Sequence, residues 1–252
     1  MRLQPVRLGS LIVSAVLAAG VLGQVSSPSP ARQPAAQRPA DQPTAGRVAP
    51  RPKPKATTSP SRKTRMSTQQ TRHGSKKVLY LTFDDGPQHI WTQKVLAVLA
   101  KHHARATFFA LGKQVADFPD LLPKVRAAGH AVGNHTFDHK KLTELPLAEV
   151  RWQLRHGPPS RCFRPPFRET NAQIAAIAAS YGMRQILWTA DTLDWKEPGA
   201  EKIESAIMKG AAPGAVILLH DGGGDRSQTV RALDRALTRL RAKGYEFRSL
   251  DC

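Results

Sequence analysis

Short apolar runs alternate with longer amphipathic stretches from residue 78 to the end of the chain. The short runs are typical of buried strands, and the longer stretches place apolar residues three and four positions apart, as helices do. The expected strands are residues 78–83, 106–110, 131–133, 161–163, 185–190, 215–219 and 245–249. The expected helices are residues 91–102, 121–128, 147–155, 171–181, 200–209 and 229–243. Strands that alternate with helices in this way predict a parallel sheet joined by right-handed crossovers.

Polar motifs follow most of the expected strands, and their positions distinguish two kinds of parallel fold. An open doubly wound sheet gathers its ligand-binding groups at one switch point. Here the first, third, fourth, fifth and sixth strands all deliver polar residues at their C-terminal ends, which share one face in a barrel. We therefore predict an α/β fold, a distorted and incomplete parallel β/α barrel of about seven strands. The motifs are Thr82-Phe83-Asp84-Asp85-Gly86, His135-Thr136-Phe137-Asp138-His139, Arg164-Pro165-Pro166-Phe167, Asp191-Thr192-Leu193-Asp194-Trp195 and Leu218-Leu219-His220-Asp221.

The first 23 residues have the pattern of an export signal. Residues 8–22 are an apolar run behind Arg2 and Arg7. This run is shorter than the roughly 20 residues that a membrane-spanning helix needs. We expect a signal peptide over residues 1–23, with an uncleaved membrane anchor as the alternative. The protein is therefore expected to be exported, and to be secreted or held at the cell envelope.

Residues 24–76 are basic, rich in Pro, Ala and Arg, and almost free of large apolar side chains. Such a segment cannot bury enough apolar surface to fold, so we expect a disordered linker ahead of a folded domain over residues 77–252. Residues 1–77 hold 14 Lys and Arg and one acid, which is +13 of the formal net charge of +19. This charge suits an anionic wall polymer or membrane surface, and it suits a solvated spacer equally well. We expect no nucleic-acid partner, and a monomer.

The chain has two cysteines, Cys162 and Cys252. Two thiols exclude a thiolate zinc cluster, and a domain of this size does not need a disulfide framework. Cys162 ends the fourth expected strand and Cys252 follows the seventh, and a barrel places these strands on opposite sides. We therefore expect the two cysteines to be unbridged, unless the C-terminal tail crosses over.

His135 and His139 are four residues apart, a spacing that puts both imidazoles on one side of a helical turn. With one carboxylate they make a three-ligand site for a divalent metal that leaves positions open for water and substrate. Histidine pairs at this spacing are often incidental surface residues. The adjacent Asp84 and Asp85 favour the metal site, because two neighbouring buried carboxylates repel and one of them needs a cation.

The remaining polar groups fit a hydrolytic role around such a metal. One carboxylate of the Asp84-Asp85 pair can bind the ion while the other accepts a proton, held ionised by Arg164. His220 is a second acid/base group, and Asp194 can fix its tautomer. Taken singly, Arg164 also reads as a surface ion pair, Asp194 as a helix N-cap and His220 as a satisfied core histidine. Those readings leave unexplained why all of these groups lie on one barrel face.

The motifs together resemble those of the NodB-type polysaccharide deacetylases, the family four carbohydrate esterases, from about residue 77 to residue 250. The match extends to sequence between the motifs, such as Ala106-Thr107-Phe108-Phe109 and Gly129-His130-Ala131-Val132-Gly133-Asn134. Two departures stand out. Phe167 and Arg168 replace the Tyr and Gly that are usual there, and the segment between residues 150 and 164 is short by about ten residues, within ordinary loop variation.

The resemblance implies a role for each site residue. Asp84 is the general base, and His220 is the general acid. Asp85, His135 and His139 bind zinc or a similar ion such as cobalt. Arg164 steadies Asp84, and Asp194 pairs with His220. Trp195 and Leu218 wall the acetyl pocket, and the backbone N–H of Phe167 helps to stabilise the oxyanion.

The resemblance further implies removal of acetyl groups from N-acetylated sugars of an extracellular polysaccharide, of the peptidoglycan or chitin type. An O-acetyl esterase acting on a xylan-like glycan is the alternative, and a non-catalytic glycan-binding wall protein is a third reading. A glycosidase needs two carboxylates that flank the bond at about 5 to 10 Å. Asp84 and Asp85 are too close in sequence for that, and a glycosidase would leave the two histidines without a role.

Overall fold

The computed structural model describes residues 77–252. The expected signal peptide or anchor and the expected linker lie outside these residues, so both stay predictions. Within the described part of the chain, no helix combines the length and the apolar character needed to cross a membrane.

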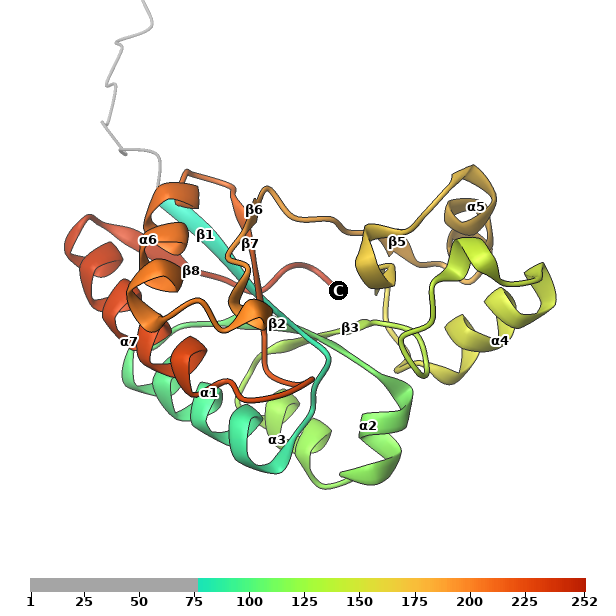
Figure 1. Cartoon of the computed structure of the whole chain (residues 1–252), viewed down its shortest axis with the longest axis horizontal. Helices are drawn as coiled ribbons and strands as arrows, with labels where there is room; N and C mark the ends of the chain where they lie inside the picture. Colours follow the sequence, from blue (N-terminus) through green and yellow to red (C-terminus); the bar gives the residue numbers. More distant parts are fainter. Residues whose placement is uncertain (1–76) are drawn as a thin grey trace, which may run out of the picture. The chain divides into compact units, whose positions relative to one another are not determined.

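The centre of the domain is a curled parallel sheet, as the sequence predicts (Figure 1). Its strands follow the order β5-β4-β3-β2-β1-β7-β6, and β8 pairs with the first residues of β1. The half-barrel of parallel strands confirms the predicted fold class. The strands are β1 (Lys77–Asp84), β2 (Ala106–Ala110), β3 (Ala131–Asn134), β4 (Cys162–Phe163), β5 (Arg184–Gln185), β6 (Ala190–Asp191), β7 (Val216–His220) and β8 (Tyr245–Phe247).

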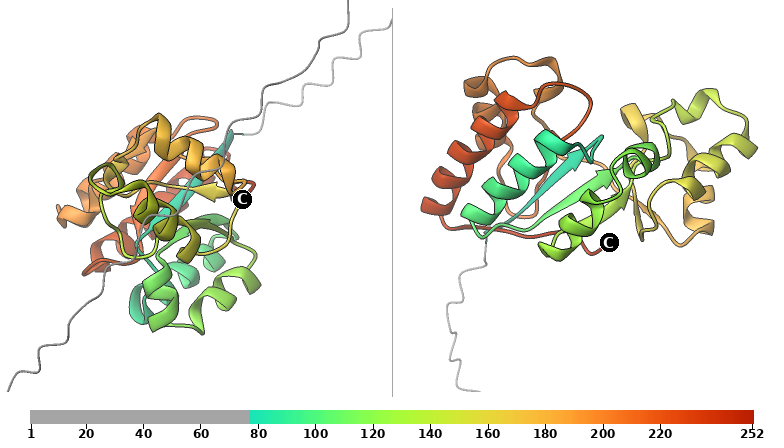
Figure 2. Two further views of the ribbon diagram at one scale, coloured as in Figure 1. Left: turned by 90° about the vertical axis from the view of Figure 1, so that its right-hand side faces the viewer. Right: turned by 90° about the horizontal axis from the view of Figure 1, so that it is seen from below.

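Helices cover the outside of the sheet in two groups. Helices α6, α7, α1 and α3 lie side by side along one flank, and α4 and α5 form a second lobe beyond β4 (Figures 1 and 2). The helices are α1 (His89–Lys101), α2 (Gly112–Asp117), α3 (Leu121–Ala127), α4 (Leu147–His156), α5 (Ala172–Ser180), α6 (Ala200–Gly210) and α7 (Ser227–Ala242). Three short 3-10 turns complete the fold: η1 (Leu142–Glu144), η2 (Pro166–Arg168) and η3 (Asp194–Lys196).

Each helical group has its own apolar core. Strand β1 supplies Leu79, Leu81 and Phe83 to the larger core beneath α1, α6 and α7. Phe163 of β4 anchors the smaller one beneath α4 and α5. Thr82 and Asp84 on the other face of β1 are also buried, which is usual for a central strand of a parallel sheet. These two polar residues face the interior of the half-barrel and begin the site.

The predicted strand over residues 185–190 is instead divided between the two ends of the sheet. β5 pairs with β4, and β6 pairs with β7. Between them, the N–H of Ile186 still donates to Phe163 O at 2.8 Å, and the N–H of Thr189 donates to Val216 O at 2.9 Å. One extended segment therefore crosses from one edge of the curled sheet to the other. It forms only a short ladder with the strand at each edge, β4 at one and β7 at the other.

Cys162 and Cys252 form a disulfide, with a Cα–Cα distance of 5.0 Å, so the expectation that they are unbridged is wrong. The tail does cross over, because β8 pairs with β1 and not beside β7. After β8, the N–H of Arg248 donates to Leu79 O and the N–H of Leu250 donates to Thr107 Oγ1. These bonds lead the tail past β1 and β2 to β4, where Cys162 lies.

Reduction of this disulfide should destabilise the domain. The bridge closes a loop over a sequence separation of 90 residues and ties the crossing tail to β4. Loss of a native disulfide from a small secreted domain typically costs about 2–5 kcal/mol. Urea unfolding with and without reductant should show that loss in the unaltered protein. The double variant Cys162→Ser/Cys252→Ser should be equally destabilised and insensitive to reductant; equal stability of reduced and oxidised protein would contradict the expectation.

Candidate active site

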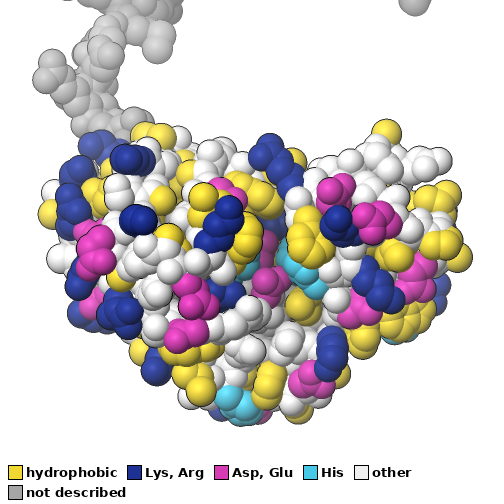
Figure 3. Space-filling view, viewed as in Figure 1, with side chains coloured by type: hydrophobic (Ala, Val, Ile, Leu, Met, Phe, Trp, Pro, Cys, Tyr) yellow, Lys and Arg dark blue, Asp and Glu magenta, His cyan; other side chains and the backbone are white. Residues whose placement is uncertain are grey.

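A cavity of about 410 Å³ opens at the C-terminal ends of the strands. On the face shown in Figure 3, a hollow exposes acidic and histidine side chains on its floor, with apolar and basic side chains around it. Most of the residues predicted for the site line the cavity, and Arg164 and Asp194 lie directly behind it. The lining residues are Asp84, Asp85, His135, His139, Pro165, Phe167, Trp188, Asp191, Trp195, Leu218, His220, Gly223 and Arg226.

Asp84 in the cavity lining forms a buried ion pair with Arg164. Nη1 of Arg164 donates to Asp84 Oδ1 at 2.7 Å and to Thr82 Oγ1 at 2.9 Å. The guanidinium carbon is 4.0 Å from the ring centre of Phe109, and the side chain has no exposed surface. Burial lowers the pKa of Arg164, and the Asp84 carboxylate partly restores it. Because an arginine stays protonated even when its pKa is lowered, a fixed positive charge holds Asp84 in place.

Asp85, His135 and His139 turn their ligand atoms toward one point. Asp85 Oδ1 is 3.4 Å from His135 Nε2 and 3.3 Å from His139 Nε2, and the ligand atoms all lie within 4.8 Å of one another. Asp85 Oδ1 is buried and accepts no hydrogen bond. Nδ1 of His135 donates to the backbone oxygen of Arg164 at 2.8 Å, which leaves Nε2 free as a ligand.

This geometry fits a metal ion. Two ligands of a tetrahedral zinc ion, each about 2.0–2.1 Å from it, lie about 3.3 Å apart. A buried carboxylate oxygen without a partner is costly, and a cation removes the cost. Burial acts to raise the pKa of Asp85, but contacts with His135 and His139 lower it well below its usual range. Burial lowers the pKa of His139, which favours the neutral form that a metal requires.

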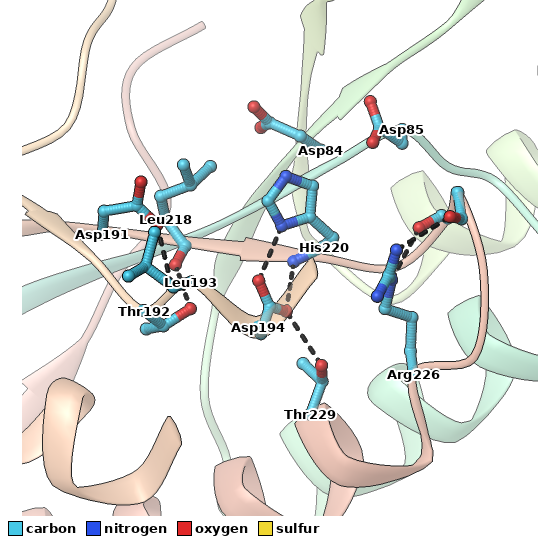
Figure 4. A network of polar contacts seen from close by, with 12 residues as sticks. Asp84, Asp85, Asp191, Thr192, Leu193, Asp194, Leu218, His220, Arg226 and Thr229 are labelled. Carbon is cyan, nitrogen blue, oxygen red and sulfur yellow. Dashed lines mark hydrogen bonds and ion pairs between the residues drawn. The ribbon is translucent and has the colours of Figure 1, made fainter. Parts of the chain in front are cut away.

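His220 at the end of β7 and Asp194 in η3 form a second buried pair (Figure 4). Nδ1 of His220 is 2.7 Å from Asp194 Oδ1. The His220 backbone N–H and the Thr229 hydroxyl donate to Asp194 Oδ2 at 2.9 and 2.8 Å. Burial acts to lower the pKa of His220, but the contact with Asp194 and the nearby carboxylates raise it to about 9. The carboxylate thus fixes the tautomer and favours the protonated ring.

Exposed apolar side chains form the walls of the cavity. Phe167 is 57 % exposed, and its ring meets that of His139 edge to face at 4.4 Å. Trp195 is 49 % exposed, while Leu218 is buried at the base. Phe167 reaches its position through an unusual backbone, with a φ of 57° inside η2. The wall residues named from the sequence therefore do border the cavity.

Sequence reasoning gave no role to Trp188, Asp191, Gly223 and Arg226, which also line the cavity. Arg226 is buried, and its guanidinium donates to Gly222 O at 2.8 Å and to Gly223 O at 2.9 Å. A Cβ on Gly222 would lie 2.1 Å from Asp85 O, so this position has to be glycine to pack against the backbone of Asp85. The three consecutive glycines after the fifth motif are the sequence feature that could have indicated this closely packed loop.

Asp221 was part of a quoted motif but had no assigned role. It is fully buried behind Asp85, and Thr92 Oγ1 donates to its Oδ2 at 2.6 Å. A Cβ on Gly86 would meet the Asp221 carboxylate at 2.3 to 2.5 Å. Burial raises the pKa of Asp221 to about 7, and the charges of the other carboxylates add to this shift. Asp221 thus supports the loop that carries Asp85.

Comparisons with known proteins agree with this geometry. The model of the family "Polysaccharide deacetylase" matches residues 71–186. The chain is 38% identical over 183 residues to a peptidoglycan-N-acetylglucosamine deacetylase of Bacillus cereus, which covers 69% of the chain and 86% of that relative. It is 34% identical over 193 residues to a chitooligosaccharide deacetylase of Azorhizobium caulinodans, covering 68% and 92%.

A solved structure shares the fold as well as the sequence. The family 4 carbohydrate esterase of Streptomyces lividans, determined in complex with acetate, superimposes with a TM-score of 0.64 at 32% identity. The match covers 68% of the chain and 91% of that structure. With extensive sequence identity to several members, and with the expected motifs gathered in one cavity, the chain belongs to the polysaccharide deacetylase family, the family 4 carbohydrate esterases.

Proposed function

We propose that this protein is a metal-dependent hydrolase that removes acetyl groups from N-acetylated sugars of a polysaccharide, of the peptidoglycan or chitin type. One observation carries the proposal. A single cavity holds an Asp-His-His set with an unpartnered carboxylate oxygen, a carboxylate held by a buried arginine, and a histidine held by a buried aspartate. The activities in the names of the Bacillus and Azorhizobium relatives support this choice of substrate.

Asp85, His135 and His139 would hold one divalent ion, and we propose zinc, with cobalt as a substitute. Two neutral imidazoles and one carboxylate suit a borderline ion of this kind, and they leave coordination positions open. When bound, such an ion polarises the acetamide carbonyl and lowers the pKa of a water molecule. The remaining steps fall to the side chains around it.

Asp84 is the proposed general base. Its Oδ1 is engaged by Arg164, while its Oδ2 lies 3.7 Å from Nε2 of His135 and so stands beside the ligand set. The free oxygen can take one proton from the attacking water, while the guanidinium holds the other oxygen in place. The backbone N–H of Phe167 is the proposed hydrogen-bond donor to the oxyanion that develops on the carbonyl oxygen of the acetyl group.

His220 is the proposed general acid. Its Nδ1 is held by Asp194, so the proton that it gives comes from Nε2, on the cavity side. A pKa of about 9 keeps the ring protonated at neutral pH. Protonation of the sugar nitrogen lets the C–N bond break, and one water and one acetamide become acetate and an amine. Trp195 and Leu218 would enclose the acetyl methyl group.

Deacetylation of a sugar ester uses the same groups, and the leaving group separates the two reactions. An amine leaves poorly unless it is protonated, whereas an alkoxide depends less on the acid. The raised pKa of His220 favours the amide reaction, because it maintains a proton donor at neutral pH. A purely glycan-binding protein would not need a complete set of acid, base and ligand residues.

Export to the cell envelope is part of the proposal. It rests on the apolar run over residues 8–22 and on the basic composition of residues 24–76, which would bring the domain close to an anionic wall polymer or membrane surface. A polymer of the envelope is an immobile substrate, so such attraction would raise the local concentration of enzyme.

Acetate release from a panel of glycans tests the proposed function. Peptidoglycan, chitooligosaccharides and acetylated xylan should be incubated with the zinc-loaded full-length protein. We expect acetate and free amino groups in equal amounts from the first two substrates. Release from acetylated xylan alone would assign the ester reaction, and no release from any of the three would refute the proposal.

Removal of the metal should abolish acetate release, and zinc or cobalt should restore it. His139→Ala should weaken zinc binding by more than about ten-fold, since even changes outside the ligand set cost about 10- to 100-fold. Competition with a chromophoric chelator measures the affinity. His156→Ala, an exposed histidine that does not line the cavity, is the matched control and should bind zinc normally. Full activity of rigorously metal-free protein would contradict this expectation.

Asp84→Asn should retain the metal but lose roughly a hundred-fold or more in kcat, the usual scale for a lost general base. The amide oxygen still accepts from Arg164 but no longer balances its buried charge, so the variant should fold with lower stability, and circular dichroism together with the zinc content checks that it folds. A variant with intact metal content and normal turnover would place the base elsewhere.

His220→Ala should lower turnover more on an amide than on an ester, because only the amine needs protonation to leave. Asp194→Asn should shift the alkaline limb of the pH profile to lower pH. The sign follows from the raised pKa of His220: the acid works below its pKa, and loss of the Asp194 charge removes a cause of the raised value. Profiles of kcat/KM against pH on both substrate types measure this; equal losses and an unmoved limb would argue against His220 as the acid.

A further inference from the structure

Two consecutive residues with side chains, Phe167 and Arg168, adopt left-handed backbone conformations, with φ values of 57° and 63°. Such values favour glycine, and residues with a Cβ rarely take them. An unfavourable backbone that persists at the edge of a functional cavity points to a function for the side chains it presents. The side chain of Phe167 lies at the cavity mouth, where its ring contacts the ring of His139.

The backbone at Arg168 brings a guanidinium to the rim of the same cavity. Its guanidinium carbon is 5.5 Å from the ring centre of Trp188, a residue that lines the cavity. Contact with an indole face orients the planar guanidinium and leaves its N–H groups available at the edge. The side chain is exposed, so a ligand can reach it.

Within residues 77–252, no carboxylate forms an ion pair with Arg168. Its neighbour Glu169 accepts a hydrogen bond from the Thr143 hydroxyl at 3.1 Å instead. Apart from Asp84 and Asp85, the acid that lines the cavity is Asp191, which ends β6 at the other end of the sheet from β4. The β4 side of the rim therefore carries a positive charge without a partner.

We propose that Arg168 and Trp188 form a subsite for a carboxylate carried by the glycan, next to the acetamide that enters the cavity. Arginine suits a carboxylate because its parallel N–H groups match the two oxygens. The subsite rests on the proposed deacetylase function and narrows its substrate: an amino-sugar polymer with carboxylates, as in peptidoglycan, is favoured over a neutral chitin-type polymer. Arg168 acts on substrate selection and takes no part in the chemical step.

The test compares two forms of the same glycan. Soluble peptidoglycan fragments are used as isolated and after their carboxylates are capped as methyl amides with a carbodiimide. Fragments that carry only lactyl carboxylates and fragments that carry stem peptides are assayed separately, which tells the two sources of carboxylate apart. The readout is the ratio of kcat/KM for acetate release from the charged form to that from the capped form, measured at several salt concentrations.

Arg168→Gln removes the charge and keeps a side chain on the left-handed backbone. We expect the charged-to-capped ratio to fall by about five-fold at low salt, the upper range for an exposed ion pair. The difference in this ratio between the unaltered enzyme and the variant should shrink with salt, since the Debye length is about 10 Å at 0.1 M.

Lys196→Gln is the matched control. Lys196 is also an exposed rim cation over a cavity tryptophan, 4.9 Å from the ring centre of Trp195, but it lies on the acidic side.

Arg168→Gly separates the charge from the backbone conformation. Glycine relieves the left-handed strain, so this variant should melt at a higher temperature and still lose the same preference as the glutamine variant. A ratio that is unchanged in both Arg168 variants, or that falls equally in Lys196→Gln, overturns the subsite. If the unaltered enzyme releases no acetate from any form, the proposed function fails. If it releases acetate but the charged-to-capped ratio is the same in the Arg168 variants, only the subsite fails.

Discussion

The ion pair between Arg164 and Asp84 is the interaction on which the site depends. The side chain of Arg164 fixes Asp84 and Thr82 on β1, and its Nε donates to Ile186 O in the segment that crosses between the sheet edges. Its backbone oxygen also accepts from His135 Nδ1 and so orients one of the proposed metal ligands. Removal of one partner from such a pair typically costs about 3–5 kcal/mol, because an unpaired buried charge remains. Arg164 thus holds the proposed base, orients a proposed metal ligand and binds the segment that crosses between the two sheet edges.

Strand register explains why these groups meet. Asp84 is directly paired with His220 across β1 and β7, so the proposed base and acid come from neighbouring positions of one ladder. Asn134 is paired with Phe163 across β3 and β4, and the next residues are His135 and Arg164. The convergence could be predicted from the sequence because each motif directly follows an apolar run, and parallel strands end on one face.

Other features depend on contacts that local patterns do not encode. The disulfide follows from the choice of β1 as the partner of β8, a pairing between the two ends of the domain. The division of residues 184–191 between two sheet edges depends on how far the sheet curls. The roles of Asp221 and Arg226 depend on burial against the loop of Asp85, and neither residue differs in sequence from an ordinary surface charge. Helix α2 is too short to show a helical period.

Backbone strain is concentrated around the cavity. Among the described residues other than glycine, eight have positive φ values: Asp85, His103, Thr136, His139, Phe167, Arg168, Leu193 and Glu197. All except His103 lie in or beside the polar motifs. Each such residue costs free energy that the surrounding contacts must offset, and at Asp85 these include the glycine loop held by Arg226 and the N–H of Leu111, which donates to Gly86 O. The two cores therefore support a site whose own backbone is locally unfavourable, and Asp85 and His139, two of the three proposed metal ligands, are among the residues that bear this strain.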